Sequence, residues 1–228
     1  MSAIRLLALI LLCTILLGAC DRSDLIRVRL LSPIGETKKD HAIYSDLTKV
    51  STSKTTSANP KTSGGSLLFL FKSIGLGYTT LTTQIEKEAR TTAGDDLILK
   101  EKTTLVTNFT DLAFGIGENY SFMWGAGVLT GGEQERYVAY TDKETKKLWV
   151  DNDLVGHSLF FALGHHGSGF ETLLGYRMNF IKSKFDDSGT KIPSHMGKSP
   201  AIRKVVSYES SVIRLTTSQV QLGIGVTF

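Results

Sequence analysis

The sequence predicts an all-β fold: a transmembrane, antiparallel, up-and-down β-barrel with eight strands as the favoured count. Apolar and polar residues alternate with a period of two in several segments. No apolar run after residue 20 is long enough for a transmembrane helix. The connections between the alternating segments are short and long in turn. Because lipid offers no hydrogen bonds, a membrane-spanning chain without helices must close its sheet.

Residues 1–19 differ from the rest of the chain and predict an export signal. Arg5 is their only charge, and an almost unbroken apolar run follows from Leu6 to Leu17. A basic start, a short apolar run and small residues after it describe a secretory signal peptide. A retained membrane anchor is the alternative, but such an anchor needs roughly 20 apolar residues.

The signal ends in Leu17-Gly18-Ala19-Cys20. These residues resemble the lipobox of bacterial lipoproteins, and the resemblance implies cleavage before Cys20 and attachment of lipid to it. Ordinary cleavage nearby, which leaves Cys20 unmodified, is the alternative. The other cysteine, Cys13, is removed with the signal, so no disulfide is expected in the mature chain.

Residues 20–66 form an N-terminal segment whose place in the barrel is open. Apolar and basic residues alternate over 25–31, and 42–50 is a second candidate strand, so the two are expected to supply the first hairpin. The Ser- and Thr-rich stretch 51–65 has the composition of a flexible linker. In the alternative layout, residues 21–65 are a disordered or peripheral stalk, and the strand count is completed by splitting segments or by oligomerisation.

Residues 67–228 are expected to form the barrel proper. In one segment, Tyr120 and Trp124 share a face, and Ser121 and Gly125 lie on the other. Glycine recurs on the polar face, where it makes room in a narrow lumen. The alternating segments lie at about 73–79, 111–117, 120–130, 153–165, 170–184 and 219–228.

The last segment carries the clearest pattern. Val220, Leu222, Ile224, Val226 and Phe228 lie on one face, and polar residues or glycine occupy the other. Its length is about that of a membrane-crossing strand, and apolar outside with polar inside is the arrangement of transmembrane barrels. A final Phe resembles the assembly signal of outer-membrane barrels, and this resemblance assigns that role to Phe228.

The connections supply an independent prediction, because bacterial barrels have short periplasmic turns and longer outer loops. The polar stretches 86–96, 141–147 and 186–205 are expected on the outer side. The short turns at 118–119 and 165–169 are expected on the periplasmic side. The connections therefore alternate as an up-and-down topology requires.

Over about residues 67–228 the chain resembles small bacterial outer-membrane β-barrel proteins, the group that includes membrane-anchoring and opacity-type barrels. The resemblance implies a structural or surface-interaction role in a Gram-negative cell envelope. Outer-membrane lipid and the barrel-assembly machinery are the implied partners, and the ligand of the outer loops is not identified. Asp21 departs from the pattern, because an Asp after the acylated cysteine resembles an inner-membrane retention signal of enteric lipoproteins.

Three charged residues, Asp111, Glu171 and Arg177, are expected to point into the barrel, because each lies on the polar face of its segment. An eight-stranded barrel has an interior just wide enough for side chains. Opposite charges there should pair to avoid isolated burial. A salt-bridge network is the favoured interpretation, and a selectivity ring in a pore is the alternative.

The cluster His165-His166-Gly167-Ser168, with Glu171 nearby, contains the residue types of a nucleophilic hydrolase. It resembles the His–Ser pair of small outer-membrane barrels that trim lipid A. However, the cluster falls in a turn expected on the periplasmic side, whereas those enzymes act on the outer leaflet. A polar hairpin turn is the favoured interpretation, and we assign no catalytic residue.

Metal, cofactor and nucleic-acid binding are not expected. His157 and His165 share a strand face but are separated by roughly 26 Å along a strand, and His41 and His195 are isolated, so no metal-ligand spacing exists. The net charge of +4 is spread along the chain without basic runs interleaved with aromatics. We therefore predict a non-enzymatic barrel; the alternatives are a lipid-anchored soluble β-rich periplasmic protein and a lipid-modifying enzyme.

Overall fold

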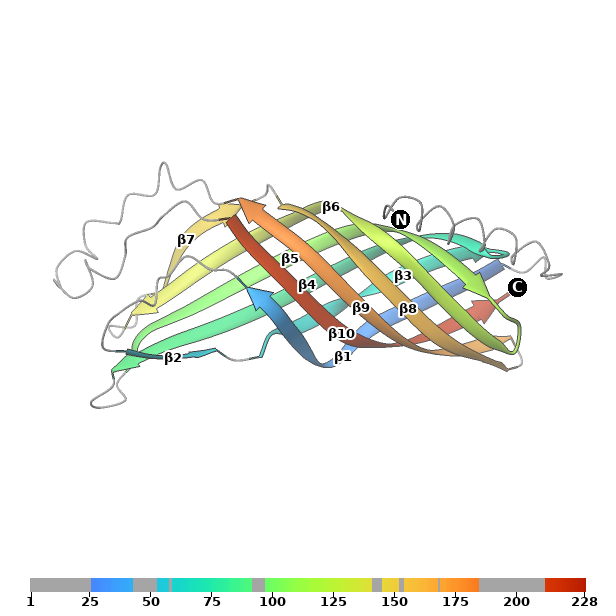
Figure 1. Ribbon diagram of the computed structural model, residues 1–228, viewed down its shortest axis with the longest axis horizontal. Coiled ribbons are helices and arrows are strands. Elements are labelled where there is room, and N and C mark those ends of the chain that lie inside the picture. Colours follow the sequence, from blue (N-terminus) through green and yellow to red (C-terminus); the bar gives the residue numbers. More distant parts are fainter. Residues whose placement is uncertain are drawn as a thin grey trace, which may run out of the picture.

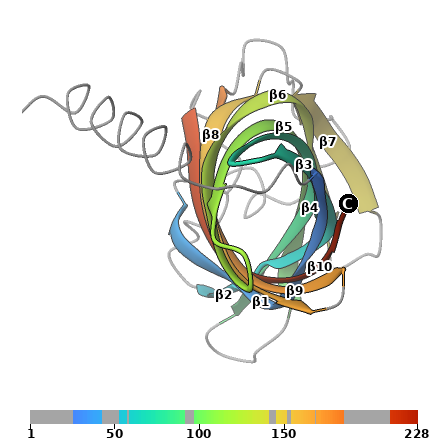
Figure 2. The same ribbon diagram turned by 90° about the vertical axis from the view of Figure 1, so that its right-hand side faces the viewer.

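The computed structural model describes residues 26–42, 53–57, 59–91, 97–140, 145–151, 154–167, 169–184 and 212–228. In these residues ten strands form one sheet. The strands are β1 (Ile26–Ala42), β2 (Ser53–Ser57), β3 (Lys61–Phe71), β4 (Ile74–Thr91), β5 (Leu97–Ile116), β6 (Tyr120–Tyr140), β7 (Thr145–Asp151), β8 (Leu154–Gly167), β9 (Phe170–Lys184) and β10 (Val212–Thr227). They run obliquely along the molecule in Figure 1 and surround a central space in Figure 2.

Eight of these strands close the barrel. Each pairs antiparallel with its neighbours in the circular order β1, β10, β9, β8, β6, β5, β4, β3 and back to β1. The short β2 and β7 pair with β4 and β6, beyond the parts of those strands that pair with β3 and β8. The predicted eight-stranded antiparallel barrel is confirmed.

The N-terminal segment differs in part from its prediction. β1 covers the strand expected at 25–31, but its hairpin partner is β3, and residues 43–50 lie outside the described residues. The linker expected over 51–65 is wrong, because β2 and the first half of β3 pair with β4 as strands. A polar strand can have the same Ser- and Thr-rich composition as a linker when neither of its faces needs to be apolar.

We name the two ends of the barrel by the elements that meet there. At the terminal end β1 begins beside the end of β10, since Ile26 and Phe228 exchange backbone hydrogen bonds of 3.2 and 2.9 Å. Short turns follow β3, β5 and β8 at this end, and β1, β4, β6 and β9 end at the far end. The ends of the described strands alternate as predicted, although 86–91 belong to β4 and 145–147 belong to β7. The predicted outer stretch 186–205 lies outside the described residues.

In the half of the barrel nearest the terminal end, the terminal half, apolar side chains cover the outside. On β4, Ile74, Leu76 and Tyr78 are 49%, 64% and 52% exposed. The other strands contribute similarly exposed side chains, including Leu30, Phe69, Leu112, Val128, Leu163, Leu174 and Leu222. We call this surface the apolar belt; an apolar band around a barrel is the surface that faces lipid. No helix in the described part of the chain is long and apolar enough to cross a membrane.

Aromatic side chains gather on the belt at the terminal end. Tyr120, Phe170, Phe228 and Phe71 are among its most exposed members and occupy strand ends there. Two further aromatics of the outer face, Trp124 and Tyr176, are half-buried. Aromatic girdles of this kind mark the level of the lipid headgroups in membrane barrels.

In the far half of the barrel, the apolar side chains lie on the inner face instead. On β4, Leu81 and Ile85 are buried, whereas Thr82 and Gln84 lie on the outer face. The β3–β4 ladder continues through this change without a register shift, so the strand has not flipped. Up to Tyr78 the apolar residues of β4 lie on the outer face, and beyond it they lie on the inner face. This change marks the edge of the apolar belt.

The ladder between β1 and β3 is incomplete. β1 pairs with β3 only as far as Leu31 and Ser66, although both strands continue towards the far end. We call the unpaired stretch the β1–β3 seam. Isolated hydrogen bonds cross it: Ser32 Oγ to the Gly64 carbonyl at 3.0 Å, the Thr37 amide to the Pro60 carbonyl at 3.3 Å, and Asn59 Nδ2 to Glu36 Oε2 at 2.7 Å.

Candidate functional site

An ion pair lies in the lumen near the boundary between the two halves, and we call it the mid-lumen pair. β5 and β9 place Asp111 and Arg177 on the inner face, where both are buried. The two Arg177 Nη atoms donate to the two carboxylate oxygens of Asp111 at 2.8 and 2.9 Å. This bidentate geometry is the strongest form of an arginine–carboxylate contact.

Neighbouring polar side chains hold the same pair. Arg177 donates from Nη2 to Ser158 Oγ at 2.6 Å, from Nη1 to Thr79 Oγ1 at 3.1 Å, and from Nε to Asn179 Oδ1 at 3.1 Å. The Thr79 hydroxyl also bonds Asp111. Because both charges are buried, these added hydrogen bonds offset a desolvation cost that the pair alone would not recover.

Aromatic rings enclose the Arg177 guanidinium. Its Cζ lies 4.9 Å from the ring centroid of Phe109 and 5.2 Å from that of Phe160. Both distances are within the range of cation–π attraction. The ion pair therefore joins the apolar packing of the lumen and does not line an open channel at this point.

A second ion pair, the terminal pair, lies closer to the terminal end. Arg29 of β1 donates from Nε and Nη2 to Glu171 of β9 at 2.7 and 2.6 Å. Nη2 also donates to Ser121 Oγ at 2.9 Å, and the Ser121 hydroxyl bonds Glu171. The Arg29 Nη1 atom is buried without a hydrogen-bond partner in the described structure. The terminal pair is thus less completely satisfied than the mid-lumen pair.

Buried apolar side chains accompany both pairs inside the barrel. One buried cluster belongs to the terminal half: Leu31, Leu68, Leu70, Ala113, Met123, Phe160, Ala162 and Leu173. The other belongs to the far half: Leu81, Ile85, Leu105, Phe109, Leu154, Ile181 and Leu215. Each buried carboxylate already has an arginine partner, so the geometry favours an interior salt-bridge network over a selectivity ring.

The sequence-predicted site residues occupy different regions. Asp111, Glu171 and Arg177 lie inside the barrel, but Asp111 and Glu171 belong to separate ion pairs. Phe228 is at the terminal end with an exposed ring, and its proposed role in assembly stays a prediction. Cys20 lies outside the described residues.

Sequence reasoning did not assign Arg29 to the interior, although it is the partner of Glu171. The signal was present, because Arg27 and Arg29 alternate with the apolar residues of β1. Once the strand is placed in the barrel, that alternation puts both arginines on the inner face. Arg27 is buried as well and donates to the Gly117 carbonyl at 2.8 Å.

The candidate hydrolase cluster is dispersed in the described part of the chain. Glu171 is engaged with Arg29, and His165 lies on the outer face with its ring centroid 5.0 Å from that of Tyr120. His166 Nδ1 is 3.4 Å from Thr227 Oγ1, and Ser168 lies outside the described residues. Within the described residues no three His, Cys, Asp or Glu side chains are grouped as metal ligands.

The closed eight-stranded barrel with its apolar belt defines a small β-barrel of the outer-membrane type. No family model and no curated protein matches the sequence. Among solved structures, the barrel is similar to Neisserial surface protein A, at 9% identity over 90% of this chain and 98% of that one, with a TM-score of 0.42. It is also similar to the outer membrane protein OprG from Pseudomonas aeruginosa, at 12% identity over 90% and 94%, with a TM-score of 0.39.

A third similar structure is Ail, the attachment invasion locus protein of Yersinia pestis, in complex with the heparin analogue sucrose octasulfate. The identity is 13% over 90% of this chain and 97% of that one, with a TM-score of 0.37. Likenesses at this level do not carry a function from one barrel to another.

Proposed function

We propose that this protein is an integral barrel of the bacterial outer membrane with a structural or surface-interaction role and no enzymatic activity. The exchange of apolar residues between faces within single strands supports this best. The terminal half has the outer surface of a lipid-embedded wall, and the far half has the polar outside and apolar inside of a barrel in water. The far half therefore projects from the membrane and can present the connections at its end to partners.

The buried packing inside the described part of the barrel supports a role that does not depend on conduction. Both ion pairs are internally neutral, and two clusters of buried apolar side chains accompany them. We expect the purified barrel to show no steady conductance in a planar bilayer. The same apolar belt disfavours a soluble periplasmic protein, because that protein would have to pack these exposed side chains against each other.

The termini lie on the periplasmic side of bacterial barrels, so we place the far end outside the cell. As part of the proposal, residues 1–19 direct export, Cys20 carries lipid, and the barrel-assembly machinery recognises Phe228. Mass spectrometry of the mature N-terminus tests the lipid directly: a mature chain that begins at an acylated Cys20 is expected, and an unmodified cysteine would remove this part of the proposal.

Electrophoresis of the outer-membrane fraction, with and without boiling, tests the location and the fold together. A faster band in the unboiled sample is expected, because closed barrels resist detergent. Recovery in the inner-membrane or soluble fraction without such a shift would overturn the proposal.

Cysteine labelling on intact cells tests which half projects. Thr104→Cys lies on the outer face of the far half, and Leu163→Cys lies on the apolar belt. A membrane-impermeant maleimide is expected to label the first and not the second. Equal labelling of the two variants would contradict the assignment of the halves.

A further inference from the structure

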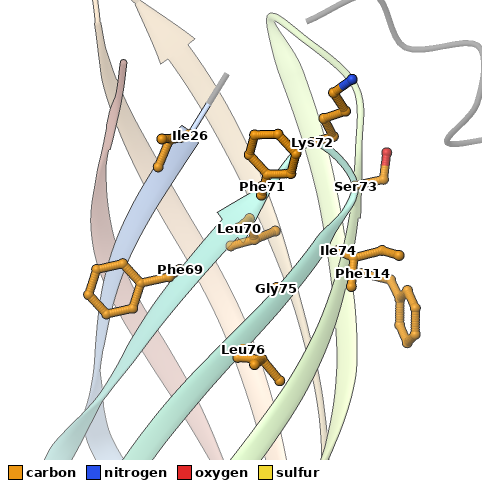
Figure 3. Close-up of a pocket in the computed structure, with 10 residues that line it drawn as sticks. All are labelled: Ile26, Phe69, Leu70, Phe71, Lys72, Ser73, Ile74, Gly75, Leu76 and Phe114. Carbon is orange, nitrogen blue, oxygen red and sulfur yellow. The ribbon is translucent and has the colours of Figure 1, made fainter. Parts of the chain in front are cut away.

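A groove runs along the apolar belt at the terminal end, between β1, β3, β4 and β5. It has a volume of about 620 Å³ and an almost entirely apolar lining. Its lining includes Phe69, Phe71, Ile74, Leu76 and Phe114 (Figure 3). The groove faces lipid if the belt does, and its apolar lining suits an acyl chain.

The β3–β4 turn places two polar side chains at one end of this groove. Lys72 and Ser73 both line it, and in Figure 3 their polar atoms point the same way, past Phe71. The Lys72 Nζ lies 5.7 Å from the Phe71 ring centroid. Ser73 is only 8% exposed, and its hydroxyl oxygen has no hydrogen-bond partner within the described structure. An ammonium and a hydroxyl donor thus sit together where the apolar lining ends.

Along the barrel axis, this turn lies where lipid headgroups are expected. Phe71 belongs to the exposed aromatic girdle at the terminal end, and Lys72 is the next residue along the chain. Among the described residues, Lys72 is the only lysine or arginine that is exposed at this end, because Arg27 is buried. The turn also holds Lys72 at φ +54°, a conformation that non-glycine residues seldom adopt.

We propose that this groove is a binding site for an anionic phospholipid of the leaflet at the terminal end. One acyl chain lies along the apolar lining, the Lys72 ammonium pairs with the phosphate, and the Ser73 hydroxyl donates to a phosphate oxygen. The inference rests on the proposed membrane location, because the groove faces lipid only there.

Native mass spectrometry of the folded full-length barrel tests the site. Dioleoyl phosphatidylglycerol and dioleoyl phosphatidylcholine are titrated separately, and the bound lipids are counted. The wild type is expected to retain phosphatidylglycerol preferentially. Lys72→Asn removes the charge and keeps a residue that tolerates positive φ, so it should lower phosphatidylglycerol affinity about fivefold, the effect of one basic residue near an anionic membrane. Its phosphatidylcholine binding should not change.

Lys61→Asn is the matched control, because Lys61 is an exposed lysine at the start of β3, at the other end of the barrel from the β3–β4 turn. It should behave as wild type. Leu76→Trp, which fills the groove from its lipid-facing side, should reduce retention of both lipids, and Ser73→Ala should weaken phosphatidylglycerol binding less than Lys72→Asn does.

Equal retention of the two lipids by the wild type, or equal behaviour of the two lysine variants, would overturn the site. Displacement of phosphatidylglycerol by an equal concentration of inorganic phosphate would also overturn it, because the acyl chain would then contribute nothing to the affinity. Every variant is first checked for the unboiled mobility shift. A barrel that folds in lipid but shows no preference removes only this inference, whereas a chain that does not fold in lipid removes the proposed function.

Discussion

The terminal and far halves of the barrel use the same strands and opposite surfaces. On β5, Leu112 of the terminal half is exposed and lies on the outer face, whereas Phe109 and Leu105 of the far half are buried inside. The β4–β5 ladder keeps its register across this boundary, so the backbone is the same in both halves. The same strand can therefore carry its apolar residues on either face, and the surroundings of each half decide which face must be apolar.

The largest loss of stability is expected when a buried side chain is removed from the inner face of the far half. Phe109→Ala deletes a fully buried ring that also stacks on Arg177, and it should lower the free energy of unfolding by about 3–5 kcal/mol. Phe114→Ala is the control on the same strand; its ring packs on the outer face beside Trp124, and we expect a smaller loss. Urea titration of the barrel in lipid vesicles measures both, and equal losses would remove the distinction between the faces.

A charge on the outer face tests the belt itself. Ile224→Arg places a cation on the apolar belt and should cost about 2–4 kcal/mol if the site lies near the membrane midplane. Thr216→Arg lies on the same strand and outer face in the far half, where a surface substitution should cost about 0.5 kcal/mol or less. The same urea titration compares them. A similar cost for the two arginines would mean that the far half is also embedded in lipid.

The smallest expected effect concerns the boundary between the halves. A Cβ at Gly127 would lie 2.1 Å from Asp111 Oδ1 and 2.6 Å from Ser158 Oγ, whereas at Gly131 its closest contact would be 3.7 Å. Gly127→Ala should therefore push the mid-lumen pair apart and cost about 1–3 kcal/mol through overpacking. Gly131→Ala on the same strand should be close to neutral. The temperature at which the unboiled mobility shift is lost reports both variants.

Sequence reasoning predicted the terminal half better than the far half, for a physical reason. Lipid requires an apolar outer face, so Val220 to Phe228 alternate plainly and their strand is found. In the far half the outer face is polar and some inner positions are polar too, so residues 61–65 resemble a linker although they belong to β3. The strand ends at 86–91 are polar outside for the same reason and resemble a loop.

For the buried ion pairs, the sequence predicted only that the charged residues lie on the inner face of the barrel. Alternation places Asp111, Glu171 and Arg177 on polar faces, but it does not say which charge meets which. Arg29 and Glu171 are 142 residues apart, and strand order and register bring them together. The groove beside the β3–β4 turn could not be predicted from the sequence, because residues of four strands and of this turn line it.

The β1–β3 seam has a consequence for how the barrel would fail under load. A complete ladder must be broken pair by pair, whereas along the seam only isolated hydrogen bonds join β1 to the chain on its β3 side. A force that separates β1 from β3 should therefore break the Ser32–Gly64 contact first. The paired residues from Leu31 to Ile26 should then separate in order towards the terminal end. The unpaired backbone of β1 and β3 also resembles the free edge of an open sheet, where an added strand can pair.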